Sequence, residues 1–157
     1  MSHERNRPRH AGYRLRDRGL VVVSDDDLIV HDWSPFIAAL STWGVRAVGP
    51  FGVLLNRGDR DQPYSRGKHS DRTPFSGTCD VLKGRWIMTR VSTLQRVLMF
   101  GGHRNIAEDI CISASFALRG GLRIVPAAVE ELPGPHASST SPEHMPTRDA
   151  VARSVLR

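Results

Sequence analysis

Cysteine and long apolar runs are both scarce in this chain of 157 residues. Cys79 and Cys111 are too few for a disulfide framework, and neither belongs to a CxxC or Cys/His pattern with metal-ligand spacing. No apolar stretch approaches the roughly 20 residues of a bilayer-crossing helix, and the arginine-rich start has no apolar signal-peptide core. These absences predict buried, reduced thiols and a cytoplasmic protein that does not contact a membrane.

Common enzyme signatures are absent as well. Ser113 and Ser115 lie in a predicted helix and not in a GxSxG turn. Gly101-Gly102 lacks the further glycines or the Lys-Ser/Thr pair of a nucleotide-binding loop. Five histidines show no paired spacing on one helix face, which favours core or surface roles over metal binding: His31, His69, His103, His136 and His144. We therefore predict that the chain is not an enzyme.

Positive charge is concentrated at the N-terminus. Residues 1–18 contribute +4 of the net charge of +6, because six arginines stand against Glu4 and Asp17. These arginines are Arg5, Arg7, Arg9, Arg14, Arg16 and Arg18. The segment has no apolar face to bury, so we predict a disordered basic arm. It is either a solvated tail or an arm that contacts nucleic-acid phosphates without sequence preference, which we keep as the alternative function.

Residues 19–132 form the predicted domain, in which strand-like and helix-like segments alternate. Leu20–Ser24 has the composition of a buried strand. A helix is predicted to begin with Ser34 as its cap and Pro35 in its first turn, and to end at Gly44. Val45–Val48 follows as a strand, so this part predicts one right-handed βαβ unit.

The rest of the domain continues the alternation after an irregular stretch. Phe51–Asn56 fits a short helix or a strand, and Arg57 to Ser76 is expected to form a loop. The later segments are predicted as a helix over Cys79–Trp86, a strand over Gln95–Phe100, a helix over Asn105–Leu118, a strand over Leu122–Val125 and a short helix over Pro126–Leu132. This order predicts an α/β fold with a doubly wound, mostly parallel five-stranded sheet. Residues 133–146 are predicted as a linker and residues 147–157 as a short C-terminal helix.

Three consecutive acids, Asp25-Asp26-Asp27, follow the first predicted strand directly. Ligands of open α/β sheets bind outside the carboxyl ends of the strands. Clustered carboxylates there repel one another unless a hard cation such as Mg²⁺ neutralises them. The stretch predicts a magnesium site that handles phosphoryl groups; a solvated turn or a helix cap is the other interpretation.

The order of these segments resembles the receiver domain of bacterial two-component response regulators. Leu20–Asp27 is similar to that family's first strand and acidic cluster, and Phe36–Gly44 is similar to its first helix. Arg96–Phe100 is similar to its fourth strand, and Ala117–Val125 to its fourth helix running into its fifth strand. The resemblance covers residues 19–132 and implies a flavodoxin-like fold.

The resemblance implies a phosphorylation site with its metal and its partners. Asp71, in Ser70-Asp71-Arg72-Thr73-Pro74, would be the phosphoacceptor. Asp25, Asp26 and Asp71 would hold Mg²⁺, which neutralises the phosphoryl oxygens during transfer. The implied partner is a sensor histidine kinase or another regulator, in signal transduction and transcription regulation. An ordinary surface acid is the alternative interpretation of Asp71.

Two positions depart from the family's pattern. Receivers carry Ser or Thr after the fourth strand, where this chain has Gly101-Gly102, and Lys after the fifth, where it has Pro126-Ala127-Ala128. We therefore predict a degenerate receiver-like signalling module with impaired phosphorylation, which acts by protein–protein contacts. Ser141 to Arg157 resembles the start of a helix-turn-helix domain without a recognition helix, so specific DNA binding is not expected. A hydrolase that uses the Asp cluster with Mg²⁺ is a further hypothesis.

Overall fold

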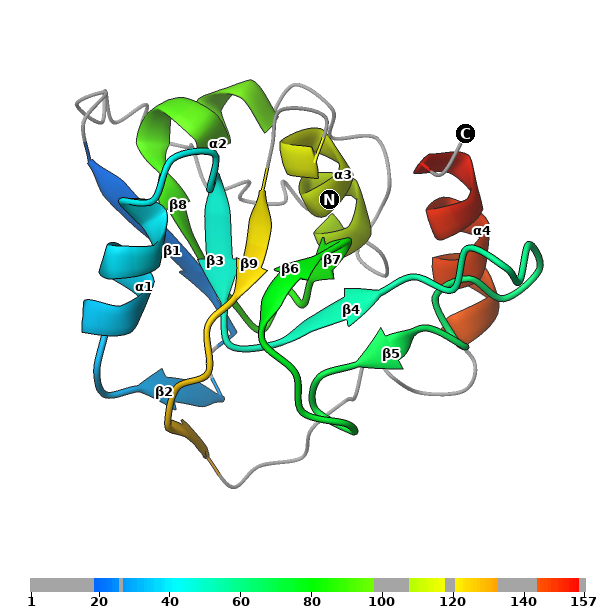
Figure 1. The fold of residues 1–157 in the computed structure, drawn as a ribbon, viewed down its shortest axis with the longest axis horizontal. Coiled ribbons are helices and arrows are strands. Elements are labelled where there is room, and N and C mark those ends of the chain that lie inside the picture. The colour runs from blue at the N-terminus through cyan, green and yellow to red at the C-terminus, as the bar shows by residue number, and fades with distance from the viewer. Residues whose placement is uncertain (1–18, 26, 98–107, 118–120, 133–143, 156–157) are drawn as a thin grey trace, which may run out of the picture.

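The computed structural model describes residues 19–25, 27–97, 108–117, 121–132 and 144–155. These residues form three β-sheets and four helices (Figure 1). The strands are β1 (Leu20–Ser24), β2 (Leu28–Val30), β3 (Ala47–Gly49), β4 (Gly52–Leu54), β5 (Lys68–His69), β6 (Gly77–Cys79), β7 (Val81–Leu82), β8 (Trp86–Arg90), β9 (Leu122–Ile124) and β10 (Val129–Glu131). The helices are α1 (Ser34–Leu40), α2 (Val91–Val97), α3 (Glu108–Ala117) and α4 (Met145–Val155). The predicted basic arm, residues 1–18, and residues 133–143 of the predicted linker lie outside the described residues.

The main sheet is mixed, which corrects the predicted fold class. Its strand order is β1-β8-β3-β9-β6, in which β3 and β9 run parallel and the other three neighbouring pairs are antiparallel. A two-stranded sheet, β10-β2, and a three-stranded sheet, β5-β4-β7, complete the described strands. The prediction of a doubly wound, mostly parallel sheet is therefore wrong. β8 lies between β1 and β3 and runs antiparallel to both, so it replaces the parallel pairing that the prediction required between these two strands.

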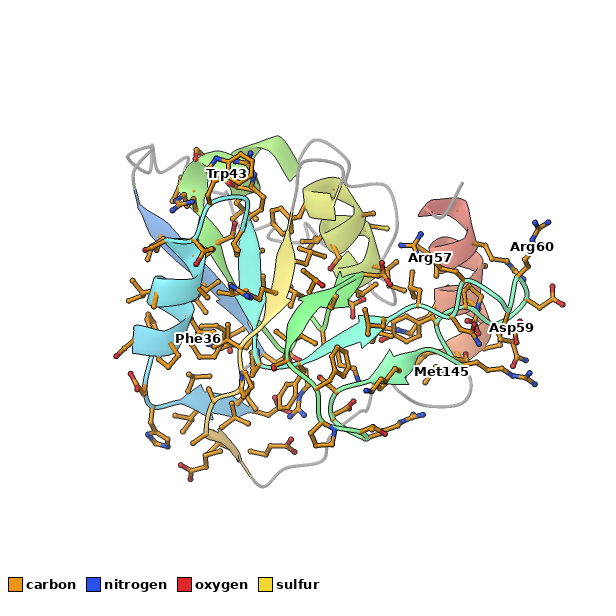
Figure 2. The ribbon with its side chains drawn as sticks, in the orientation of Figure 1. Phe36, Trp43, Arg57, Asp59, Arg60 and Met145 are labelled. Atoms are coloured by element: carbon orange, nitrogen blue, oxygen red, sulfur yellow. The ribbon has the colours of Figure 1, made fainter. Side chains whose placement is uncertain are left out.

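The segments β1, α1 and β3 come close to the predicted βαβ unit, but another strand lies between the two strands. Both β1 and β3 are antiparallel to β8, so they point in the same direction without pairing. The helix covers this part of the sheet through Phe36 and Leu40, which are buried, and Figure 2 shows Phe36 directed inward from α1. The local sequence predicts the two strands and the helix, whereas β8 comes from a distant part of the chain.

The helix predicted to begin at Ser34 is present, but it ends at Leu40, before the predicted end at Gly44, and its predicted cap is wrong. Trp33 occupies the N-cap position and Ser34 is the first helical residue. The carboxylate of Asp32 accepts a hydrogen bond from the Ser34 amide over 2.8 Å. Pro35 lies in the first turn, as predicted. Gly44 follows the helix with a φ of +84°, a backbone conformation that favours glycine.

Three predicted segments have a different secondary structure. Residues 79–86 contain the end of β6, all of β7 and the start of β8 instead of a helix. Strands this short leave no clear apolar periodicity. Residues 95–97 belong to α2 instead of a strand, and residues 98–100 lie outside the described residues. Residues 126–132 contain β10 instead of a helix, because Val129 pairs with Val30 of β2.

Other segments match their predictions. The predicted strand Leu20–Ser24 is β1, and β9 covers residues 122–124 of the predicted strand 122–125. α3 covers residues 108–117 of the predicted helix 105–118. Residues 51–56, which fit either a short helix or a strand, contain the strand β4. The C-terminal helix begins at Met145, two residues before its predicted start.

Three clusters of buried apolar side chains hold these elements together. The first lies between α1 and the main sheet and includes Phe36, Trp86 and Met88. The second includes Phe116 of α3 and Leu122 of β9. The third joins the three-stranded sheet to α3 and α4 through Val53, Tyr64, Ile110 and Ala152, among others. In the parts of the chain that the structure describes, no helix combines the length and the apolar character needed to cross a membrane.

Candidate functional site

The predicted phosphoacceptor Asp71 lies in a turn after β5, beside a buried lysine. Its carboxylate accepts a hydrogen bond from the Lys83 ammonium group over 2.7 Å. The side chain of Lys83 is 6 % exposed, whereas that of Asp71 is 35 % exposed. Burial raises the pKa of Asp71, but the hydrogen bond and charge of Lys83 outweigh burial and hold that pKa below its ordinary value. Burial lowers the pKa of Lys83, and the contact with Asp71 opposes this shift.

A buried histidine lies two residues before Asp71. The Nε2 atom of His69 is 2.8 Å from the carbonyl oxygen of Tyr64, so this nitrogen carries the hydrogen and donates it. The ring is 2 % exposed, and its Nδ1 atom has no hydrogen-bond partner among the described residues. Burial lowers the pKa of His69, and the positive charges of Lys83 and Arg72 act in the same direction. His69 is therefore a neutral imidazole whose remaining nitrogen offers a lone pair.

Beside the histidine, a fully buried ion pair joins α4 to α3. The guanidinium group of Arg148 donates to the Asp109 carboxylate and, over 2.9 Å, to the Tyr64 hydroxyl. It also lies over the Tyr64 ring, 4.6 Å from the centroid, while that ring meets His69 edge-on at 5.1 Å. Burial and the negative charge of Asp109 raise the pKa of the Tyr64 hydroxyl, so it remains a neutral donor and acceptor.

Asp149, the next residue of α4, holds the turn that contains Tyr64. Its carboxylate accepts hydrogen bonds from the Tyr64 amide over 2.8 Å and from the Ser65 amide over 2.9 Å. It also accepts a hydrogen bond from the Ser65 hydroxyl. Both Arg148 and Asp149 are buried, so α4 packs here through a polar face as well as through Ala152. The C-terminal helix α4 therefore holds the Tyr64–Ser65 turn, which precedes Asp71 in the chain.

The other predicted metal ligands lie after β1. The Asp25 amide donates to the carbonyl oxygen of Arg85 over 2.9 Å, and the carboxylate of Asp27 lies 3.6 Å from the Arg85 guanidinium group. Asp26 lies outside the described residues. Among the residues that the structure describes, no group of three or more His, Cys, Asp or Glu side chains could hold a metal ion. The Mg²⁺ site at Asp25, Asp26 and Asp71 therefore stays a prediction, as does phosphorylation of Asp71.

A different feature distinguishes the side of the molecule that carries α1. Trp43, just after this helix, is 97 % exposed, and Figure 2 shows it near the top of the view, well away from the inward-directed Phe36. Trp33 and Ile37 are also exposed, although Trp33 keeps an edge contact with the buried Trp86 at 6.1 Å between ring centroids. Exposed tryptophan is unusual because its ring carries a large apolar area. This side can therefore bind an apolar surface.

The sequence did not indicate most of the residues that surround Asp71 or that form the exposed apolar side near α1. Lys83 is one of two lysines in the chain, but nothing in the local pattern indicates that it reaches Asp71. Arg148 stands at helical spacing before Ala152 of α4, but charged side chains are rarely fully buried, so exposure of Arg148 and Asp149 is the ordinary expectation. For Trp43 the sequence did indicate a position at the end of the helix, since this residue directly precedes Gly44.

Comparisons with known proteins find no similarity that would identify the chain. No family model matches it. Neither the curated proteins nor the solved structures contain a match. The functional argument therefore depends on the residues themselves.

Proposed function

We propose that this chain is a protein-binding module, which docks a partner protein through the side formed by β1, β2 and α1. The observation that carries this proposal is the position of the large apolar residues that are exposed. Among the described residues there are seven, and six of them lie between residues 20 and 43: Leu20, Val23, Ile29, Trp33, Ile37 and Trp43. The seventh is Leu54 of β4.

Their concentration in the one segment from β1 to the turn after α1 matters more than the exposure of any one of them. Single exposed apolar side chains are normal in folded proteins, whereas a concentration of them indicates an interaction surface. The helix α1 buries Phe36 and Leu40 but exposes Ile37, so its apolar residues extend to the outer face. Tryptophans are enriched among the side chains that dominate binding energy at interfaces. Trp33 and Trp43 are therefore the expected anchors.

The proposal keeps the protein contacts expected from the sequence and leaves out the phosphorelay. The resemblance to receiver domains implied a doubly wound parallel sheet, and the observed sheet is mixed. A docking surface needs only the exposed side chains and the packing that holds them. The cytoplasmic location belongs to the same proposal.

Surface substitutions test the proposal. The wild-type chain is used to isolate its binding partner from cells that produce it, and the purified partner is then titrated with variants. We expect Ile37→Gln and Trp43→Gln each to weaken binding at least about tenfold, which corresponds to about 1.4 kcal/mol. Leu54→Gln is the matched control, because it removes an equally apolar exposed side chain from another part of the surface. Equal affinity for all three variants and the wild type would reject the docking surface.

A second proposal concerns nucleic acid and depends on the six arginines of residues 1–18. Phosphate contacts of this kind give affinity that falls with salt and has no sequence preference. A chain that begins at residue 19 is expected to lose salt-sensitive retention on random-sequence DNA. Unchanged retention would reject the arm as the binding element.

A further inference from the structure

Every second residue of β1, beginning with Leu20, directs its backbone groups away from the rest of the sheet. The carbonyl oxygen of Gly19 accepts a hydrogen bond from the Val91 amide, and the Asp25 amide donates to the Arg85 carbonyl, both over 2.9 Å. Hydrogen-bonded pairs alternate along an antiparallel ladder, so the odd-numbered residues of this strand bond to β8. The N–H and C=O groups of Leu20, Val22 and Ser24 therefore point to the opposite side.

That opposite side is a sheet edge. β1 is the last strand in the order β1-β8-β3-β9-β6, and no described strand pairs with its outer side. Natural edge strands are usually protected by charged side chains, proline or a bulge. The sequence Leu-Val-Val-Val-Ser has neither a charge nor a proline, and it pairs with β8 over five consecutive residues without a bulge. Such an edge favours the addition of another strand.

We propose that a second copy of this chain occupies the edge, by antiparallel pairing of β1 with β1 about a twofold axis at Val22. In this register Val22 lies opposite Val22, and Leu20 lies opposite Ser24 of the second copy. All three residues direct their backbone groups to the edge, so each opposed pair exchanges two hydrogen bonds. The same strand surface serves both copies, as a twofold interface requires.

The order of charges along the sequence favours this occupant. Arg14, Arg16 and Arg18 precede β1, and Asp25-Asp26-Asp27 follow it. Antiparallel pairing brings the start of one strand beside the end of the other, so in sequence register the basic stretch of one copy falls opposite the acidic stretch of the second. Parallel pairing would bring like charges together. Opposite charges that flank an apolar strand therefore select both a second copy and its direction.

This inference goes beyond the proposed function, because it concerns the backbone edge of β1 and not the exposed apolar side chains between residues 20 and 43. Its test is sedimentation of the full chain over a concentration series, with proline substitutions at edge-facing amides. Proline removes an N–H group but is tolerated on an edge strand, above all at its first residue. Leu20→Pro and Ser24→Pro are both made, so that one variant still reports if the other fails to fold.

We expect the wild type to dimerise and each proline variant to raise the dissociation constant at least about tenfold. Leu20→Thr is the matched control: it shortens the same side chain, keeps the amide and is expected to dimerise. Hydrogen exchange of the Leu20, Val22 and Ser24 amides should slow as the protein concentration rises.

A monomer at every concentration would overturn the proposal, as would proline variants that dimerise like the wild type. Protection of these amides in a monomer would assign the edge to the chain's own N-terminal segment and would also overturn it. These outcomes do not depend on the partner titration that tests α1.

Discussion

The carboxylate of Asp71 and the ammonium group of Lys83 are joined by a hydrogen bond of 2.7 Å, but only the lysine is fully buried. In the chain, Asp71 precedes the strands β6 and β7, and Lys83 follows them. The aspartate, with 35 % of its side chain exposed, still contacts solvent. The pair is therefore asymmetric, and its two members should respond differently to substitution.

The first prediction follows from this asymmetry. Asp71→Asn leaves a buried ammonium group without its counter-charge and should destabilise the protein by about 2–3 kcal/mol. Lys83→Met removes the buried charge and leaves a carboxylate that water can solvate, so it should cost about 1 kcal/mol or less. Urea unfolding of both variants and of the double variant measures this. The double variant should cost less than the sum of the two single variants, and a larger cost for Lys83→Met than for Asp71→Asn would contradict the prediction.

The second prediction concerns the attachment of α4. Arg148→Met removes the guanidinium group that bonds Asp109 and the Tyr64 hydroxyl in a buried site. We expect a loss of about 3–5 kcal/mol, because a buried carboxylate then lacks this cation. Arg153→Met on the same helix is the control, since Arg153 is exposed and bonds the carbonyl oxygen of Asp61. Its cost should stay below about 1 kcal/mol. Similar costs in chemical unfolding would show that the buried ion pair does not attach the helix.

The third prediction concerns the turn held by Asp149. Asp149→Ala removes the acceptor of the Tyr64 and Ser65 amides, and leaving buried amides unbonded should cost about 2–3 kcal/mol. Ser65→Ala removes only the hydroxyl bond and should cost about 1 kcal/mol. Thermal unfolding, followed by circular dichroism, compares the two variants. If Ser65→Ala were the more harmful change, the carboxylate would not be the main support of this turn.

The fourth prediction is a dependence of stability on pH that arises from His69. Burial lowers the pKa of this histidine in the folded state, whereas unfolding returns it to its ordinary value near 6.5. The unfolded chain therefore binds more protons between these two values, and stability falls as the pH drops. The contribution of neutral His69 is complete above the unfolded pKa and is lost as the pH falls through the folded pKa.

A glutamine variant isolates this contribution. His69→Gln keeps a side-chain N–H group for the Tyr64 carbonyl oxygen but does not titrate. Free energies of unfolding are measured from about pH 7.5 to about pH 5, where an ordinary histidine becomes protonated. The wild type should lose stability faster than His69→Gln over this range. Parallel curves would show that the histidine is not buried in its neutral form.

How much of the fold was predictable depended on the length of each element. β1 was predicted with its observed bounds, because five apolar and small residues precede three acids. α1 and α3 have enough turns for their apolar positions to repeat. Residues 79–86 contain parts of three short strands, which the sequence presents as one apolar segment that fits a helix equally well.

The candidate site shows the same division. Asp71 was identified as a candidate from the sequence, but its neighbours Lys83, His69 and Tyr64 were not, because the turns that bring them together are irregular. The exposed apolar side chains around α1 also depend on tertiary packing. The pattern of α1 does not distinguish the outward-facing Ile37 from the inward-facing Phe36, since both are large and apolar.

By itself, the sequence determined the segments whose physical causes are local: the apolar β1 strand, the proline-started α1 helix and the concentration of arginine before residue 19. Only the tertiary structure decided that β8 would lie between β1 and β3, which charges would be buried together and which side of α1 would remain exposed. Strand pairing and ion pairing join residues that are distant in the chain, and several partners satisfy the same local pattern. The choice among them is made by the packing of the whole molecule.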